Sequence, residues 1–582
     1  MSHSGPKIRI AEHIEIAWAA DTHHRLACPN CGHNGDAAKL LDIDYRPPDA
    51  EHFYQIHICS ACTALFFDNV ETMDYGTPEL IEIGWHIYQT QIGAGIWPIT
   101  EPLTRIAKPA GARLLEIGGA YGFGLDFGVR ARGWVGEGYD PSPLAEFGIR
   151  ELGLTVTQDY FEEKDLAKGP YDVVIATEVV EHLAHPPGFF QLMRRALADN
   201  GILMLTTPNG ALVAPAQAAN ILLPTLSPGA HLVLQTAHSL QIALQNAGFS
   251  HVQILETDMT LIAYASAAAF TLGQDVAAGR AMFRQYLVER GRVAEPESDL
   301  RFGFAGRGMF EAVQDGDYDA AEAAWSVLVP AAKQRFALDL NSMTALPAAT
   351  ARASLADLAR IIPLGLGMIL YSRAIYLLCR GQKRADVLPV FRMSLAALDA
   401  LQGALAQRSL IDGLSASLLG ATKAEILLCL ADTAHPDTVA EAQSLLQQDA
   451  ASITIIWRAF VSLVSSGAFE TARHLQKALE LYLPDNSFAF ELRRDALFSL
   501  GVLALQDEKY YPRAAESFRQ LRTLFLNNQA DPGNMFWPAV RGEVIALDRL
   551  SRRDLATSLL SELIPLHGGA PVDLLERQRA KA

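Results

Sequence analysis

The 582-residue chain has little positive charge, few cysteines and no long uncharged apolar run. Its 48 Lys and Arg residues are outnumbered by 65 Asp and Glu residues, which gives a formal net charge of −17. A general nucleic-acid binder needs a surplus of cations to displace counterions from phosphates, and attraction to an acidic membrane surface needs the same surplus. The sequence therefore predicts neither a nucleic-acid partner nor binding to acidic membranes.

Two further absences concern membranes. The first residues, MSHSGPKIRIAEH, do not contain the apolar stretch of a signal peptide. The most apolar later run, 361–379, is interrupted by Pro363 and carries Arg373, and its uncharged part is too short to cross a bilayer. We therefore expect a buried helix in this run, no membrane span, and a cytoplasmic protein.

Only six cysteines occur, and four of them form two pairs of equal spacing, Cys28 with Cys31 and Cys59 with Cys62. Each pair presents two thiolates on one tight turn, and two such turns can surround a Zn²⁺ ion. Two disulfides or four free thiols are the alternatives, but disulfides are disfavoured in a cytosolic chain. The sequence predicts a structural zinc site in a small ribbon-like segment, residues 1–75, with a strand near 53–58.

The stretch around which the chain is organised is RLLEIGGAYGFGLDFGVRARGWVGEGYDP, residues 113–141. It begins with an apolar strand at 114–117, which is followed by a glycine-rich turn and a helix at 123–131. A second strand, 134–139, ends at an acid. A strand, a glycine turn, a helix and a strand ending in an acid make half of a nucleotide-binding βαβ unit.

The charges near the loop restrict which class of ligand this unit can bind. Ala120 stands where a dinucleotide site has its second glycine, and Glu116 would repel a pyrophosphate. A carboxylate at Glu116 suits an ammonium group instead, and Asp140 is placed to accept a hydrogen bond from a ribose. An ammonium group at one end and a ribose at the other describe S-adenosylmethionine. The alternative is a turn that serves only the packing of strand against helix.

The motif E-I-G-G-A-Y-G resembles the first motif of class I S-adenosylmethionine-dependent methyltransferases, and Y-D-P resembles the end of their second strand. The resemblance covers about residues 90–266. It implies a Rossmann-like α/β fold with a mostly parallel seven-stranded sheet, in which Asp159 accepts a hydrogen bond from the adenine amino group. The cofactor-binding residues that it implies are Glu116, Gly118, Gly119, Gly122, Asp140, Asp159, Tyr160, Thr177 and Glu178. Ala120 departs from the usual glycine, which predicts altered contact with the cofactor and not lost binding.

Strands and helices keep alternating after Asp140, and we place the α/β domain within residues 76–270. Helices that cap the cofactor are expected within 84–106. Tyr75 and Tyr88 are candidates to face the site, and packing is the alternative role for them. A final hairpin is expected to add one antiparallel edge strand to the sheet. The expected strands are 155–157, 171–176, 201–207, 252–256 and 261–266, and the expected helices are 143–153, 187–197 and 238–247.

The loop TEVVEH, residues 177–182, follows an expected strand at the sheet edge where open α/β proteins bind ligands. Three roles stay open for it. His182, assisted by Glu181, can act as a general base toward a substrate hydroxyl. E-x-x-E-H also resembles the metal-binding motif of ubiquinone-pathway O-methyltransferases and small-RNA 2′-O-methyltransferases, which implies Mg²⁺ or another divalent cation held by Glu178, Glu181, His182 and His231. In the third role, these residues only shape the loop.

From about residue 268 the strands disappear and the pattern becomes helical. Ala472, Ala514 and Ala556 are each 42 residues apart within segments that resemble tetratricopeptide-type helix pairs. That period is longer than the roughly 34 residues of the standard repeat, and the small residue lets paired helices approach each other. We expect a separately folding all-α solenoid over residues 275–582, used to bind a protein partner.

Taken together, these features predict a methyltransferase that acts on a small metabolite or a sugar. The N-terminal cysteine segment is similar to one found in bacterial methyltransferases of glycan and natural-product clusters. O-methylation is slightly favoured, while methylation of carbon or nitrogen stays open. The alternative is a catalytically weak scaffold that binds the cofactor while its solenoid recruits proteins. The intact acids Glu116, Asp140 and Asp159 favour the enzyme.

Overall fold

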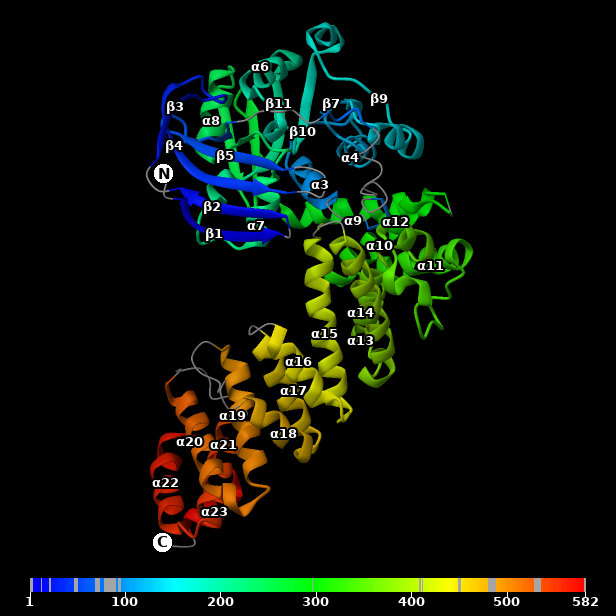
Figure 1. Cartoon of the computed structure of the whole chain (residues 1–582). Helices are drawn as coiled ribbons and strands as arrows, with labels where there is room; N and C mark the ends of the chain where they lie inside the picture. Colours follow the sequence, from blue (N-terminus) through cyan, green and yellow to red (C-terminus); the bar gives the residue numbers. More distant parts are fainter. Residues whose placement is uncertain are drawn as a thin grey trace. The chain divides into compact units, whose positions relative to one another are not determined.

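The computed structural model describes residues 4–579, apart from 12, 20–21, 47–50, 69–73, 78–89, 93–95, 296, 408–409, 411, 449–451, 480–487 and 528–534. The chain divides into two compact units. The first consists of Met1–Ile369 and Ala397–Ala416, and the second of Leu370–Ala396 and Ser417–Ala582. Figure 1 shows the α/β part in blue to green and the helices of the second unit in yellow to red.

The first unit contains a seven-stranded sheet in the order β13–β14–β11–β10–β7–β8–β9. The five strands from β11 to β9 run parallel, whereas β14 is antiparallel to both of its neighbours. The sheet is therefore mixed, and its antiparallel strand lies second from the edge, not at the edge as predicted, because β13 pairs with its outer side. The strands are β7 (Arg113–Ile117), β8 (Val135–Tyr139), β9 (Val156–Thr157), β10 (Tyr171–Thr177), β11 (Leu197–Pro208), β13 (His251–Glu256) and β14 (Thr260–Ser266).

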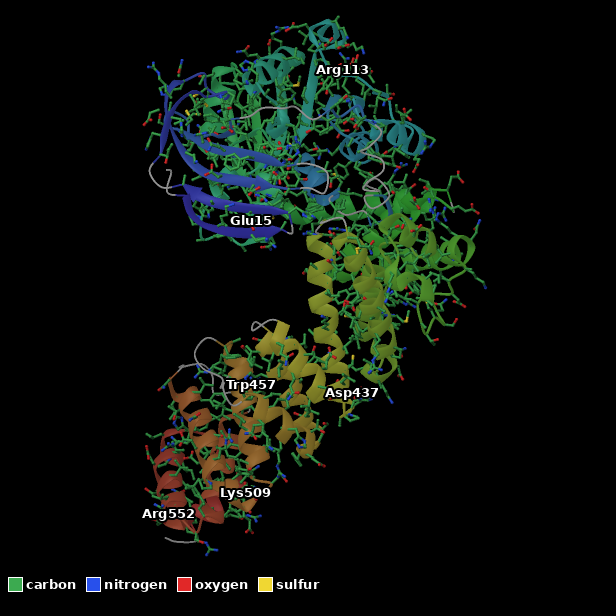
Figure 2. All side chains as sticks on the ribbon, viewed as in Figure 1. Glu15, Arg113, Asp437, Trp457, Lys509 and Arg552 are labelled. Carbon is green, nitrogen blue, oxygen red and sulfur yellow. The ribbon has the colours of Figure 1, made fainter. Side chains whose placement is uncertain are left out.

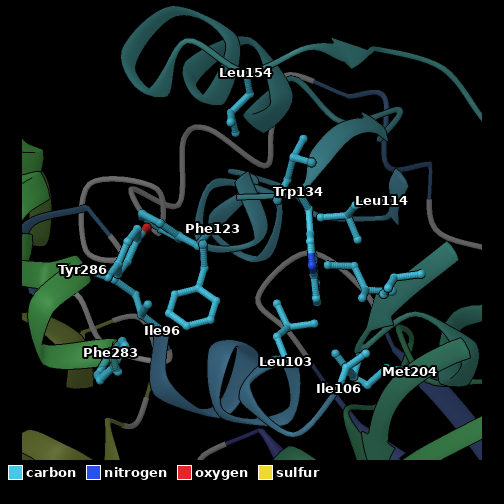
Figure 3. Packing of buried hydrophobic residues seen from close by; sticks show 14 of the residues in the cluster. Ile96, Leu103, Ile106, Leu114, Phe123, Trp134, Leu154, Met204, Phe283 and Tyr286 are labelled. Carbon is cyan, nitrogen blue, oxygen red and sulfur yellow. The ribbon is translucent and has the colours of Figure 1, made fainter. Parts of the chain in front are cut away.

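Both faces of this sheet are buried, which explains why its central strands read as continuous apolar runs. Successive residues of a strand point to opposite faces. On β10, Val173 and Ile175 join one buried cluster, and Val174 and Ala176 join the other. The first cluster, which Figure 3 shows, lies against α3 (Ile96–Thr104) and α4 (Phe123–Arg130). The second lies against α6 (Pro186–Ala196) and α8 (Ala237–Asn246).

The N-terminal segment forms a second sheet, larger than the predicted ribbon. Its strands pair antiparallel in the order β1–β2–β4–β5–β6–β12, and β3 pairs with β4. Its core also contains Val213, Leu222 and Leu226, which come from the α/β region and in part from α7 (Ala219–Leu226). The sheet is thus completed by residues far along the chain. The strands are β1 (Ser4–Ala11), β2 (Ile14–Ala19), β3 (His23–Ala27), β4 (Asn34–Tyr45), β5 (His52–Cys59), β6 (Leu65–Phe67) and β12 (Val233–Leu234).

Helices α9 (Val276–Val293) and α10 (Asp299–Gln314) pack on the α/β region within the first unit. Phe283, Tyr286 and Phe304 belong to the same buried cluster as residues of β7 and α4, and Figure 3 shows Phe283 and Tyr286 beside Phe123. The division between compact units therefore follows Ile369 and differs from the boundary predicted at 270–275. Within the segment expected to cap the cofactor, α3 is helical, while Tyr88 lies outside the described residues.

The second unit contains consecutive helices whose pairs repeat with the spacing read from the sequence. Ala472, Ala514 and Ala556 are all fully buried, at 0% exposure, each on the second helix of a pair. Trp457, labelled in Figure 2, is buried in this part of the chain. From residue 438 onward, the helices among the described residues are α16 (Thr438–Gln448), α17 (Ile453–Ser465), α18 (Phe469–Leu479), α19 (Phe490–Ala504), α20 (Tyr511–Asn527), α21 (Phe536–Arg549), α22 (Arg553–Leu566) and α23 (Val572–Arg579).

The apolar run expected as one helix forms two, α12 (Leu355–Ile361) and α13 (Leu366–Cys379), which are bent by 49°. Pro363 lies at the break, where it cannot continue a helix. By length and composition alone, α15 (Gly413–Asp432) and this bent pair taken as one span are the helices among the described residues that could cross a membrane. Core helices of soluble proteins meet the same criterion, so the observation decides nothing about a membrane.

Candidate cofactor and acceptor site

The glycine-rich loop after β7 contains several residues with positive φ and packs against the Glu116 side chain. Gly118, Ala120 and Gly122 have φ values of +65°, +49° and +84°, a backbone region that glycine adopts freely and alanine does not. A Cβ atom added at Gly119 would collide with the Glu116 carboxylate. Glycine at 119 is therefore required by the acid beneath the loop, and Ala120 holds a left-handed conformation without being glycine.

Asp140, which follows β8, fixes the shape of this loop. Its Oδ2 accepts a hydrogen bond from the Ala120 N–H at 2.6 Å. Its Oδ1 accepts from the Ser142 N–H at 2.8 Å and from the Ser142 hydroxyl at 2.5 Å. A carboxylate has roughly four lone-pair positions, so the carboxylate keeps room for about one further donor. That room suits one ribose hydroxyl and not the whole diol.

The electrostatics of the loop favour a cationic ligand. Glu116 is only 3% exposed, and burial raises its pKa to about 8, assisted by the negative Asp140 and Asp126. Burial also raises the pKa of Asp140, against the lowering effect of the bonds from Ser142 and Ala120. A positive charge placed beside two such acids would stabilise their ionised forms.

The other residues predicted to bind the cofactor lie at the same edge of the sheet but are held more loosely. Asp159 and Tyr160 follow β9, and the Asp159 Oδ1 accepts a hydrogen bond from the Tyr160 N–H at 2.8 Å. Tyr160 is 55% exposed. Thr177 is the last residue of β10 and pairs with Thr206 of β11.

Two carboxyl groups follow β10, those of Glu178, which is exposed, and Glu181, which is fully buried. Glu178 has a φ of +53°, and its Oε1 accepts a hydrogen bond from the Thr206 hydroxyl at 2.8 Å. Glu181 Oε2 accepts from the Thr207 hydroxyl at 3.0 Å, whereas its Oε1 is buried without a hydrogen-bond partner. Burial, followed by the charge of Glu178, raises the pKa of Glu181 well above its usual range. A cation nearby would therefore favour the ionised form of Glu181.

Two histidines present ring nitrogens to this pair. Nδ1 of His182 lies 2.9 Å from the Ala230 carbonyl oxygen, and Nδ1 of His231 lies 2.8 Å from the Thr225 carbonyl oxygen. A carbonyl oxygen only accepts, so each Nδ1 is assigned the proton and each Nε2 keeps a lone pair. The two rings lie 5.0 Å apart between centroids. Burial lowers the pKa of both, that of His231 to about 4, so both rings are neutral at pH 7.

The structure brings together three of the four predicted cation ligands. One ligand atom each of Glu181, His182 and His231 lies within 4.8 Å of the others, and Glu181 Oε1 is 3.8 Å from His182 Nε2. Glu178 is not in this group, because Thr206 binds its carboxylate. The three residues, called the acceptor cluster below, could bind a divalent cation, or His182 Nε2 could accept a proton.

Sequence reasoning missed the side chains that support this cluster. Thr206 and Thr207 orient the two glutamates, and their only signal was their position at the end of the strand beside β10. The Tyr75 hydroxyl lies 2.7 Å from His182 Nδ1, in agreement with the idea that Tyr75 faces the site. The carbonyl groups that fix the histidines belong to the last turn of α7 (Thr225) and to the turn after it (Ala230), and neither left a signal in the sequence.

The four paired cysteines also come together. Cys28 Sγ lies 3.7 Å from Cys62 Sγ, and Cys31 Sγ lies 3.7 Å from Cys59 Sγ. All four are free of disulfides. Four thiolates about 2.3 Å from a zinc ion would be about 3.8 Å apart, so the cluster has the dimensions of a tetrahedral zinc site. A hydrogen bond from the Cys28 thiol lowers the pKa of Cys62 to about 5, which favours a thiolate.

Comparison with known proteins agrees with this geometry. A family described as "Methyltransferase domain" matches residues 94–254. A probable S-adenosylmethionine-dependent methyltransferase of Mycobacterium tuberculosis is 33% identical over 113 residues, which cover 19% of this chain and 41% of that protein. A ubiquinone biosynthesis O-methyltransferase of a Caulobacter species is 41% identical over 66 residues, which cover 11% of this chain and 26% of that protein. The chain thus spans less than half the length of these relatives.

A solved structure of a putative S-adenosylmethionine-dependent methyltransferase from Listeria monocytogenes is 15% identical, with a TM-score of 0.25, and covers 30% of this chain and 100% of its own. The family match covers the glycine loop, Asp140 and the E-x-x-E-H loop, and these residues meet at one edge of the sheet. Residues 94–254 therefore form a class I S-adenosylmethionine-dependent methyltransferase domain.

Proposed function

We propose that the protein transfers the methyl group of S-adenosylmethionine to a hydroxyl group of a small metabolite or a sugar. The observation that carries this proposal is the acceptor cluster. Glu181 and His182 follow β10 at the same sheet edge as the glycine loop and Asp140, and His231 joins them from the segment before β12. Two neutral imidazoles and a buried carboxyl group suit an acceptor that must lose a proton as it is methylated. The Caulobacter relative is named as an O-methyltransferase, which gives slight further support for oxygen over nitrogen or carbon.

A divalent cation at the acceptor cluster is part of this proposal. Glu181 Oε1 is a buried oxygen without a partner, and the two Nε2 atoms keep their lone pairs, so all three donors are available. Two imidazoles and one carboxylate suit a transition-metal ion such as Mn²⁺ better than Mg²⁺, which prefers oxygen ligands. When bound, such an ion would lower the pKa of an acceptor hydroxyl. The rival proposal keeps His182 Nε2 as the general base with no ion.

A structural zinc ion at Cys28, Cys31, Cys59 and Cys62 is also proposed. The sulfur distances and the lowered pKa of Cys62 support it. Elemental analysis of the purified chain should find about one tightly held zinc per chain, because four thiolates leave no open position. A fully folded protein that contains no zinc would contradict this assignment.

The alternative function is a scaffold with little turnover, in which the second unit recruits proteins. Exposed apolar side chains near the end of that unit favour association, since Leu566 and Val572 are 71% and 69% exposed. The two functions differ in one observable, the transfer of a methyl group. Binding of the cofactor is expected from both.

The test is a transfer assay on the full chain. Purified protein is incubated with methyl-labelled S-adenosylmethionine and the small-molecule fraction of a cell extract, and the Asp140→Ala variant serves as the control. We expect label to enter a small molecule only with the wild-type protein, and mass spectrometry then gives the methylated atom. Cofactor binding without transfer to any fraction would favour the scaffold.

A further inference from the structure

The short strand β12 and the residue before it, Leu232, connect the N-terminal sheet with the acceptor cluster. β12 pairs with β6 of the N-terminal sheet, and the Phe67 N–H donates a hydrogen bond to the Leu232 carbonyl at 3.1 Å. The Leu232 N–H in turn donates to the Glu181 carbonyl at 2.7 Å. His231 lies two residues before this strand, next to Leu232. The backbone of both Glu181 and His231 is therefore held by a segment that belongs to the N-terminal sheet.

A buried polar network ties the cysteine cluster to the end of the same strand. Asn30 lies between Cys28 and Cys31 and is 1% exposed. Its Oδ1 accepts a hydrogen bond from Gln235 Nε2 at 2.9 Å, and its Nδ2 donates to the Ser239 carbonyl at 3.2 Å and contacts Cys62 Sγ at 3.7 Å.

Gln235 Oε1 accepts from the Ser239 hydroxyl at 2.7 Å. Gln235 and Ser239 are both 0% exposed, so the amide groups of Asn30 and Gln235 are satisfied by one another and by their neighbours, without water. Only four positions separate Gln235 from His231.

Apolar packing makes the connection rigid. Leu232 and Val233 belong to the same buried cluster as Cys28, Cys59 and Cys62. A movement of the cysteine turns would open this cluster and leave the amides of Asn30 and Gln235 buried without partners. A buried polar group without a hydrogen-bond partner lowers the stability of the fold. The cysteine turns, Leu232 and β12 are therefore expected to move together.

We propose that Asn30 and Gln235 are positioning residues that couple the four-cysteine metal site to the acceptor cluster. A metal ion at the four cysteines fixes the turn that carries Asn30. Through Gln235 and β12, that turn sets the positions of His231 and Glu181. The cofactor loop is held separately, by Asp140 and Ser142. The catalytic consequence rests on the function proposed above, whereas the geometric coupling does not.

The test compares the full-length wild type with Asn30→Ala and Gln235→Ala. Gln241→Ala is the matched control, because Gln241 lies on α8 beyond Gln235 and is exposed. For each protein, four quantities are measured: zinc content, the ring NMR signals of His182 and His231 in histidine-labelled protein, affinity for S-adenosylhomocysteine, and transfer rate. A second arm removes the zinc from the wild type with a chelator.

The coupling predicts shifted ring signals for both histidines in Asn30→Ala, in Gln235→Ala and in the zinc-free wild type, with affinity for S-adenosylhomocysteine preserved. The transfer rate of the two variants should fall about 10- to 100-fold, the usual effect of losing a group that supports metal-binding residues without binding the metal itself. The control should match the wild type. Unchanged ring signals in variants that still hold zinc would overturn the coupling, as would unchanged signals after zinc removal.

Failure of the proposed function would look different. A wild-type chain that binds no S-adenosylhomocysteine would contradict the proposed methyl transfer. The ring signals would still decide the coupling in that case, because they need neither cofactor nor turnover.

Discussion

At the scale of single residues, Asp140 holds the cofactor loop and offers about one remaining acceptor position to the cofactor. Three of its hydrogen bonds come from Ala120 and Ser142, so replacing it removes the proposed ribose acceptor and also disturbs the loop. Asp159, in comparison, has a side chain that is 55% exposed. Water can replace a contact at Asp159 far more easily than at Asp140.

Asp140→Ala should therefore weaken the binding of S-adenosylhomocysteine by roughly 1.5–3 kcal/mol, the value of a hydrogen bond to a charged group. Titration calorimetry measures the change directly. Asp159→Ala is the comparison and should cost less, because its acceptor is solvated. An unchanged affinity in Asp140→Ala would show that the ribose assignment is wrong.

His231 makes the stability of the first unit depend on pH. Burial lowers its pKa to about 4 from 6.5, so between these values the unfolded chain binds a proton that the folded chain does not. The free energy of unfolding should therefore fall as the pH falls from about 6.5 to about 4, by on the order of 3 kcal/mol from this residue. Urea unfolding at several pH values tests this, with His231→Gln as the control. Equal acid sensitivity of wild type and variant would contradict the assignment.

At this scale the sequence predicted the candidate site residues better than the neighbouring side chains that hold them in place. Glu116, Asp140 and the E-x-x-E-H loop could be read because each follows an apolar strand, and parallel strands end at one edge. Glu178 was predicted as a cation ligand but is bound by Thr206. The partner of a side chain at a strand end depends on which strands become neighbours, and no single strand encodes that.

At the scale of secondary-structure elements, α9 is part of the methyltransferase domain core. The Tyr286 hydroxyl donates to Asp126 Oδ2 at 2.6 Å, and Arg290 Nε lies 2.9 Å from the same oxygen. Asp126 is on α4, directly after the cofactor loop, and is 0% exposed. The tyrosine therefore donates to one oxygen of a carboxylate that has no access to water, while Asp126 Oδ1 is buried without a hydrogen-bond partner.

Tyr286→Phe should lower the free energy of unfolding of the first unit by about 1–3 kcal/mol, because it leaves this buried acceptor short of one donor. Chemical denaturation measures the loss. Tyr160→Phe, which removes an exposed hydroxyl, should change stability little. A loss of similar size in both variants would show that the buried bond is not special.

The central strands and helices were predicted well, because apolar strands alternate with amphipathic helices from 113 to 266. β12 was not predicted, since two residues carry no periodic pattern. Its existence depends on β6, more than 160 positions earlier in the chain. The N-terminal sheet likewise borrows Leu222 and Leu226 for its core, so its extent could not be read from the first 75 residues.

At the scale of the whole molecule, the chain divides after Ile369 and not near residue 270. Solenoid-like patterning begins at α9, but the apolar face of α9 is buried against α3 and α4. The sequence shows that a helix has an apolar face and does not show which surface covers it. The boundary predicted near residue 270 marks where the sequence pattern changes from alternating strands and helices to helices alone. The hydrophobic core of the first unit, however, also includes residues of α9 and α10 beyond that point.

This division predicts the behaviour of truncated chains. A fragment of residues 1–266 leaves the cluster around Phe123 and Phe127 without Phe283 and Phe304, so it should be poorly soluble. A fragment of residues 1–416 keeps the whole first unit and should stay soluble and bind S-adenosylhomocysteine. Solubility and calorimetry of both fragments test this. A stable, cofactor-binding 1–266 fragment would show that the helices from α9 onward form a separate domain.

Activation of the acceptor at Glu181, His182 and His231 can be tested directly. The measurement is the rate of labelled methyl transfer by the full chain as wild type, His182→Ala and His231→Ala, with and without added Mn²⁺. Both variants should lose about 10²- to 10⁴-fold in rate at unchanged affinity for S-adenosylhomocysteine. Added Mn²⁺ should restore the transfer rate of wild-type protein that has been treated with a mild chelator. A loss in His182→Ala alone, without metal dependence, would favour the general base. Wild-type turnover in both variants would contradict the claim.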